Sequence, residues 1–233
     1  MKTVIMQPYF FPYLGYWQMI LTADTFVIFD DVNFIKRGWI NRNNILINGS
    51  AHLISLPLLA ASQNKHIKDI WVTDSLKDKE KLLKTIEVAY KKAPFFNDVF
   101  PIVYDTVLSK DNNLARLLRN QFESVFNYLD VKAKVLFSSD IDKNEDLRAQ
   151  DKIIDICKRL NTTHYINAIG GIDLYDQQSF ANEGMKLSFI KMRPIDYKQF
   201  NNEFVPNLSF IDVLMFNSRR DVGLMLNEFD LID

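Results

Sequence analysis

Residues 1–31 read MKTVIMQPYFFPYLGYWQMILTADTFVIFDD, and this stretch decides the fold. The short β-branched and apolar run at 3–6 ends before Gln7 and Pro8, which is typical of a buried strand followed by a turn. Residues 14–23 are compatible with a helix, and 25–29 form a second apolar run of strand length. The order strand, turn, helix, strand predicts a βαβ unit with two parallel strands.

The rest of the chain adds an antiparallel ribbon and a further alternation of helices and strands. Asn48-Gly49 lies between two apolar runs and predicts a β-hairpin over 45–57. Strands are predicted at 67–72, 134–137, 164–166 and 186–190, and helices at 76–92, at 114–129 and near the end of the chain. Three capping boxes indicate helix starts, at Ser75 with Asp78, Asp142 with Glu145, and Ser209 with Asp212.

These elements together predict an α/β fold. We expect a Rossmann-like three-layer core with a mainly parallel sheet, an added β-hairpin, a helical insertion and C-terminal helices. No linker composition marks a domain boundary, so we expect a single domain over 1–233 that can contain a helical subdomain at about 75–130.

Charge and cysteine content exclude several classes of protein. Lys and Arg number 28 against 29 Asp and Glu, which gives a net charge of −1 and no field for attracting nucleic acid. The lone Cys157 cannot form an internal disulfide, so we expect a reducing compartment, the cytoplasm. Gln7, Pro8 and Pro12 interrupt the apolar stretch that a signal peptide needs, and no segment reaches the roughly 18 to 20 apolar residues that span a bilayer.

Polar and aromatic side chains follow the first two predicted strands, where ligands of parallel sheets bind. Asp30 and Asp31 come directly after the second strand, and either carboxylate can act as a general base if burial raises its pKa. The proposed substrate-binding residues of this region are Gln7, Tyr13, Tyr16, Lys36, Arg37, Trp39 and Arg42. The three cations suit a phosphate or carboxylate, and the rings suit a sugar. The alternative is that the rings belong to the core and the charges to a solvated loop.

A second candidate lies after the strand predicted at 164–166. Gly170 and Gly171 stand between that strand and the next helical segment, flanked by Asn167 and Tyr175. Glycines at such a place let the backbone approach a phosphate or a sugar, or they simply turn the chain. Both readings stay open, because the segment matches neither the dinucleotide fingerprint nor the P-loop.

Several kinds of catalytic site have no support in the sequence. His52, His66 and His164 are far apart and lack the spacing of metal ligands, so we expect no metal site and no cofactor. Cys157 lies on the apolar face of a predicted helix, and we assign it to the core. Nucleophile-elbow and HExxH motifs are absent from the sequence.

The blocks MQPYFFPYLGYWQMI at 6–20 and ADTFVIFDDVNFIKRGWINRNNI at 23–45 resemble the WbqC-like protein family of bacteria. Two later segments, 165–175 and 204–214, resemble its later blocks, so the likeness extends over nearly the whole chain. The resemblance implies a role with O-antigen and other surface polysaccharides, and transfer of an aminoacyl or acyl group, such as glycine, to an amino sugar. It gives weight to Gln7, Pro8, Gly15, Asp30, Asp31, Lys36, Trp39, Arg42, Gly170, Gly171 and Asp212, without assigning roles.

The opening of the chain is also similar, more distantly, to nucleotidylyltransferase-type α/β enzymes. Those enzymes carry a His-x-Gly-His signature at the turn where this chain has Tyr13-Leu14-Gly15-Tyr16. Both imidazoles are missing, so the likeness implies the fold and not nucleotidyl transfer.

The sequence is therefore compatible with three functions. The first is a transferase acting on a nucleotide-activated sugar, with the diphosphate against Lys36, Arg37 or Arg42 and the sugar on Tyr13, Tyr16 or Trp39. The second is a module that binds a sugar nucleotide without catalysis. The third is an interaction protein that docks a partner through its aromatic loop. The position of the polar groups at the strand ends favours the first.

Overall fold

The computed structural model describes residues 1–201 and 203–233. The order of elements confirms the predicted α/β fold. The strands of the main sheet are β1 (Lys2–Met6), β2 (Thr25–Ile28), β7 (Lys134–Phe137), β8 (His164–Ala168), β9 (Lys186–Met192) and β10 (Phe229–Ile232). The helices are α1 (Leu14–Leu21), α2 (Leu76–Tyr90), α3 (Phe96–Val107), α4 (Leu114–Leu129), α5 (Ala149–Arg159), α6 (Gln177–Asn182), α7 (Phe210–Phe216) and α8 (Arg219–Met225).

The main sheet has six strands in the order β10-β9-β8-β1-β2-β7. All neighbouring pairs are parallel except β10 with β9. The chain builds outward from β1 to β2 and β7, and then returns to the other side of β1 with β8. The carboxyl ends of β1 and β8 are therefore the point where the strand order reverses, which is where open α/β sheets bind their ligands.

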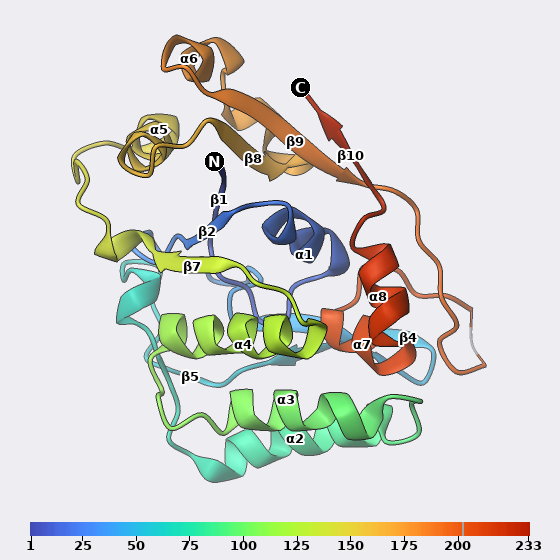
Figure 1. Cartoon of the computed structure of the whole chain (residues 1–233). Coiled ribbons are helices and arrows are strands. Elements are labelled where there is room, and N and C mark those ends of the chain that lie inside the picture. The colour runs from blue at the N-terminus through green and yellow to red at the C-terminus, as the bar shows by residue number, and fades with distance from the viewer. Residues whose placement is uncertain (202) are drawn as a thin grey trace.

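Alternate residues of the central strands enter two different hydrophobic clusters. Val4 and Phe26 face the cluster that contains α1 and α4, whereas Ile5 and Val27 face the cluster that contains α5. Figure 1 shows α5 and α6 on one side of the sheet and α4 on the other, with α2 and α3 beyond it. The three-layer arrangement follows from this alternation, since each strand has side chains buried on both faces.

The chain between β2 and α2 forms two small sheets. β3 (Arg42–Ile47) and β4 (Ser50–Ser55) make the predicted hairpin, in which Asn48 and Gly49 both have positive φ. β5 (Leu58–Leu59) pairs with β6 (Trp71–Val72), and the 3₁₀ turn η1 (Ile67–Asp69) lies between them in the chain. Another 3₁₀ turn, η2 (Ser138–Asp140), follows β7.

The helices α2, α3 and α4 pack side by side, with α3 in the middle. α3 contacts both α2 and α4, and residues of all three helices belong to the same hydrophobic cluster as α1. Within the described part of the chain, no helix combines the length and the apolar content that crossing a membrane requires.

Two predictions of secondary structure are wrong, and two elements were missed. The strand expected at 67–72 begins with the 3₁₀ turn η1 and is a strand only at Trp71–Val72, and the helix expected from Asp142 begins only at Ala149. α3 was not predicted, because Pro101 lies inside it and proline is disfavoured there. β10 was not predicted either, although it completes the sheet after the last helix.

Candidate functional site

The turn between β1 and α1 is fixed by polar side chains from three distant elements. Phe11 has a φ of 40°, which is rare for a residue with a side chain. Asn43 donates to the carbonyls of Phe10 and Phe11 at 3.1 and 2.7 Å, and Gln121 of α4 accepts from the Phe11 N–H at 2.9 Å. Ser209 donates to the Phe11 carbonyl at 2.8 Å. Because its backbone is held from several sides, the turn presents its side chains in one geometry.

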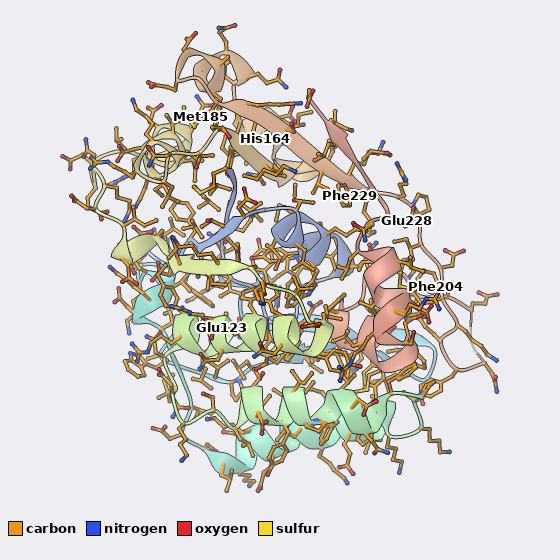
Figure 2. The ribbon with its side chains drawn as sticks, viewed as in Figure 1. Glu123, His164, Met185, Phe204, Glu228 and Phe229 are labelled. Atoms are coloured by element: carbon orange, nitrogen blue, oxygen red, sulfur yellow. The ribbon has the colours of Figure 1, made fainter. Side chains whose placement is uncertain are left out.

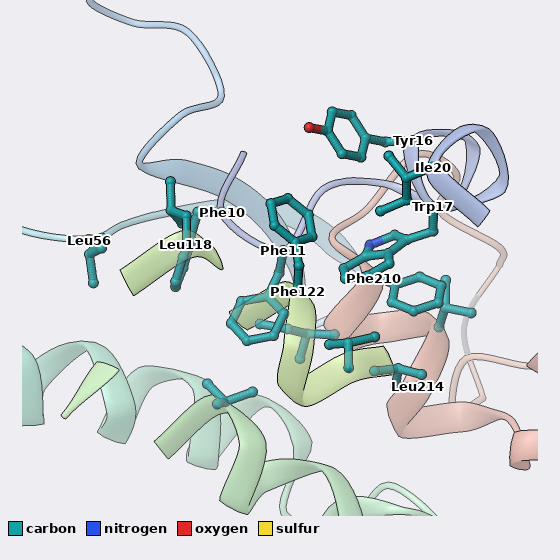
Figure 3. Packing of buried hydrophobic residues seen from close by; sticks show 14 of the residues in the cluster. Phe10, Phe11, Tyr16, Trp17, Ile20, Leu56, Leu118, Phe122, Phe210 and Leu214 are labelled. Carbon is teal, nitrogen blue, oxygen red and sulfur yellow. The ribbon is translucent and has the colours of Figure 1, made fainter. Parts of the chain in front are cut away.

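Most rings of this turn and of α1 belong to the core. Figure 3 shows Phe10, Phe11 and Trp17 packed among residues of α4 and α7. Tyr16 is 2% exposed, lies parallel to the ring of Phe122 at 5.9 Å, and donates to the Gln7 carbonyl at 2.8 Å. The expectation that Tyr16 stacks on a sugar is therefore wrong, because its ring faces are covered by the protein.

The remaining rings line a cavity of about 350 Å³. Its lining residues are Tyr9, Pro12, Tyr13, Trp39, Asn43 and Asn207. Tyr13 and Trp39 are 36% and 44% exposed, so their faces are open to a ligand. Burial raises the pKa of Tyr9 and of Tyr13, so both phenols are protonated hydrogen-bond donors at neutral pH.

Gly15 sets the position of the Tyr13 ring. A Cβ atom on residue 15 would lie 2.6 Å from Cε2 of Tyr13, which is closer than side chains approach. The absence of a side chain thus lets Tyr13 lie across the first turn of α1, at the edge of the cavity.

The three predicted cations are not brought together around this cavity. The Arg42 guanidinium lies 5.9 Å from the centre of the Trp39 ring and donates to the carbonyls of Gly38 and Arg37. Lys36 and Arg37 are exposed, and none of the three cations is among the described residues that line the cavity. Arg42 differs from the other two because it lies over Trp39, a ring of the lining.

Asp30 and Asp31 are buried beside the strand end of β7. Asp30 accepts from the hydroxyls of Ser138 and Ser139 at 3.1 and 2.7 Å, and from the Ser139 N–H at 3.0 Å. Asp31 forms ion pairs with Lys143 at 2.9 Å and Lys152 at 3.0 Å, and it also accepts from Ser138. The two neighbouring carboxylates thus share the Ser138 hydroxyl, but only Asp31 is paired with ammonium groups.

The pKa of Asp31 is lowered, whereas the proposed role as a general base depends on a raised pKa. Burial acts to raise it, but hydrogen bonds from Lys143, Ser138 and Lys152 outweigh burial and lower the pKa to about 2. The condition for Asp31 to act as a general base, a raised pKa, is therefore not met. Its carboxylate stays ionised and holds two buried ammonium groups.

Sequence reasoning missed both lysines of this cluster. The side chain of Lys143 is 0% exposed and that of Lys152 is 7% exposed. Glu145, which was expected to cap a helix, is 3.2 Å from Nζ of Lys143 and 3.5 Å from Nζ of Lys152. The predicted capping box at Asp142 is wrong because the carboxylate of Glu145 binds these ammonium groups instead.

The second predicted candidate is occupied by internal contacts. Asn167 donates to the Tyr165 hydroxyl at 2.9 Å and accepts from the Ala168 N–H at 2.7 Å, and Tyr175 packs edge-on against Tyr165. Gly170 and Gly171 lie in the 3₁₀ turn η3 (Ile169–Leu174). This segment leaves β8 next to β1, but it is not part of the described lining of the aromatic cavity.

Asp212 is a buried carboxylate that anchors the segment between β9 and α7. It accepts from Tyr90 at 2.8 Å, and from Tyr197 and Gln199 at 2.7 Å each. Burial raises its pKa, although all three donors act to lower it. The cap of α7 is Ser209 alone, since its side chain accepts from the Ile211 N–H. Figure 2 marks Phe204 in the anchored segment, which also supplies Asn207 to the cavity.

The remaining candidates lie away from this edge of the sheet. Cys157 is fully buried, as predicted, and burial raises its pKa to about 12. His164 is at the amino end of β8 (Figure 2), where it hydrogen-bonds Ser188 at 2.8 Å. Over the described residues 1–201 and 203–233, no group of three His, Cys, Asp or Glu side chains is placed to hold a metal ion.

Comparison with known proteins gives a family and one relative. The sequence model of the WbqC-like protein family matches residues 7–223. The chain is 24% identical over 219 residues to the uncharacterized protein Rv1507c of Mycobacterium tuberculosis, and the match covers 93% of each chain. No solved structure matches the chain.

Proposed function

This chain belongs to the WbqC-like protein family, and we propose that it is a transferase of surface polysaccharide synthesis. Its reaction moves an aminoacyl or acyl group, such as glycyl, to the amine of a nucleotide-linked amino sugar. The observation that carries the proposal is the aromatic cavity beside the strand end of β1.

The lining of the cavity suits a sugar ring. Tyr13 and Trp39 offer flat apolar faces on which the C–H face of a sugar can stack, and the amides of Asn43 and Asn207 offer donors and acceptors for hydroxyl groups. Arg42 adds a positive charge next to Trp39, where a phosphate of the nucleotide can bind.

In this reaction the lone pair of the sugar amine forms a C–N bond with the acyl carbon. The donor's leaving group departs with the electrons of the bond that breaks, and a base accepts the amine proton. We assign the base to Asp30, whose hydrogen-bond donors are neutral, and a positioning role to Asp31, which is held by two ammonium groups.

A second candidate is a module that binds the sugar nucleotide without catalysis. It is favoured by one observation: none of the described residues that line the cavity carries a carboxylate. Both candidates use the same cavity, so they differ only in whether product forms.

Calorimetry with a panel of nucleotide-linked amino sugars, combined with mass spectrometry of the reaction products, tests both candidates. We expect Trp39→Ala to weaken binding of the preferred sugar nucleotide roughly tenfold, or about 1.4 kcal/mol, because one stacking face is lost. Trp71→Ala is the matched control, since Trp71 is 47% exposed and has Arg116 over its ring, yet it lies in another part of the molecule.

The outcomes separate the two functions. Acylated product in the wild type, and binding without product in Asp30→Asn, support the transferase. Binding without product in the wild type, whatever acyl donor is added, supports the binding module. Equal affinity in the wild type and Trp39→Ala would place the sugar elsewhere and overturn both.

A further inference from the structure

The ammonium groups of Lys143 and Lys152 pair with Glu145, although the buried charges balance without it. Asp30 and Asp31 supply two buried negative charges, and the two lysines supply two positive charges, so the buried charges balance. The carboxylate of Glu145, whose side chain is 68% exposed, is additional to this balance. It is therefore the one charged group of the cluster that can leave without stranding a buried charge.

The ammonium groups also have capacity for another acceptor. Each ammonium carries three N–H donors. Lys143 uses its donors on Asp31, Glu145 and the Ser138 carbonyl. Lys152 has Asp31 at 3.0 Å, the longer contact to Glu145 at 3.5 Å, and the ring of Phe29 at 5.6 Å, which is a weaker partner than an oxygen acceptor. An anion in the place of the Glu145 carboxylate would reach both ammonium groups and could shorten the contact to Lys152.

The position of the cluster suits a ligand. Asp31 follows β2 and Lys143 follows β7, so the cluster lies at the carboxyl ends of two parallel strands. Lys152 is in the first turns of α5, whose N-cap residue Arg148 makes no side-chain cap, so the helix start also favours an anion.

We propose that Lys143 and Lys152 form a binding site for a small oxyanion, a phosphate or a carboxylate, and that Glu145 occupies it when no ligand is bound. Glu145 acts as an internal competitor. When the ligand binds, its oxyanion replaces the carboxylate of Glu145 on the two ammonium groups, and the loop that carries Glu145 moves outward. This site is separate from the aromatic cavity, and it needs only anion binding, not the proposed transfer reaction.

Titration calorimetry of the full chain with inorganic phosphate, pyrophosphate and acetate, at constant ionic strength, tests the proposal. We expect Glu145→Gln to bind one of these anions about tenfold more tightly than the wild type, because the competitor is removed. Glu183→Gln is the matched control: Glu183 is an exposed partner of another α5 lysine, Lys158, and its loss should leave the affinity unchanged.

A second measurement, by NMR, identifies the groups that bind the anion. The ¹⁵N signals of the lysine ammonium groups in Glu145→Gln should shift when the anion binds, and Lys152→Met should abolish that binding. Preference for phosphate or pyrophosphate identifies a phosphate site, and preference for acetate a carboxylate site. The proposal is overturned if Glu145→Gln binds no anion more tightly than the wild type, or if neither lysine signal shifts.

Discussion

Asp31 and Asp212 are two buried carboxylates that join distant parts of the chain in opposite ways. Asp31 connects the end of β2 to the segment after β7 and to α5, and its partners include two ammonium groups. Asp212 connects α7 to α2 and to the segment after β9, and its described partners are two phenols and an amide. Both carboxylates accept several hydrogen bonds, yet the pKa of Asp31 is lowered and that of Asp212 is raised.

The comparison separates charge compensation from hydrogen bonding. Neutral donors reduce the cost of burying a carboxylate, but at Asp212 they do not outweigh burial. At Asp31 the ammonium groups add positive charge, which neutral donors do not provide, and the pKa falls. The first carboxylate is therefore a fixed charge that other charges depend on, and the second is an anchor that can take up a proton.

The largest effect is expected from Asp31→Asn. The substitution leaves two buried ammonium groups without their shared carboxylate, which costs about 3–5 kcal/mol in the free energy of unfolding. Urea denaturation measures this change. Asp105→Asn, at an exposed position of α3, is the control and should change stability by about 0.5 kcal/mol or less. If the two variants are equally stable, Asp31 does not compensate the lysines.

A smaller loss in the free energy of unfolding is expected when the wild type is acidified. Because the pKa of Asp31 is lowered to about 2, its contribution is complete above its unfolded pKa of about 4 and is lost as the pH falls from 4 toward 2. The loss is on the order of 2 kcal/mol in the wild type. Urea denaturation between pH 5 and pH 2.5 measures it, and Asp31→Asn should lack this component of the acid dependence.

The smallest effect is expected from Asp212→Asn, with the opposite pH dependence. A raised pKa means that the wild type loses stability from this group as the pH rises above the unfolded value of about 4. Below pH 4 the variant should be about 1–2 kcal/mol less stable than the wild type, because one acceptor of the hydrogen bonds is replaced. The difference should shrink toward neutral pH. A difference that grows with pH would show that Asp212 is compensated as Asp31 is.

The sequence predicted the frame of the molecule because its signals are local. The run at 3–6, the helix of α1 and the Asn48-Gly49 turn each depend on a few adjacent residues, and the parallel pairing of β1 with β2 follows from the βαβ pattern. α3 and β10 were missed for the same reason. Pro101 contradicts the local helix pattern, and no local signal indicates that Phe229–Ile232 pairs with β9, more than thirty residues earlier in the chain.

The site was predicted less completely because its contacts are not local. Tyr13 and Trp39 line a cavity, and their binding of a substrate stays a prediction. Tyr16 has the same composition signal as Tyr13, and only its packing against Phe122 distinguishes the two. Lys143 and Lys152 lie more than a hundred residues from Asp31 in the chain, so no spacing in the sequence indicates that they meet.

The hydrogen bonds of the turn at Phe11 also set an order on the assembly of the protein. The partners of this turn lie 32, 110 and 198 residues further along the chain, at Asn43, Gln121 and Ser209. Contacts of such long sequence separation form late, since the intervening chain must first be closed into a loop. During synthesis from the N-terminus the turn therefore waits until Ser209 has left the ribosome. The turn is synthesised before its partners and is completed after them, and a chain that stops before α7 lacks a finished cavity.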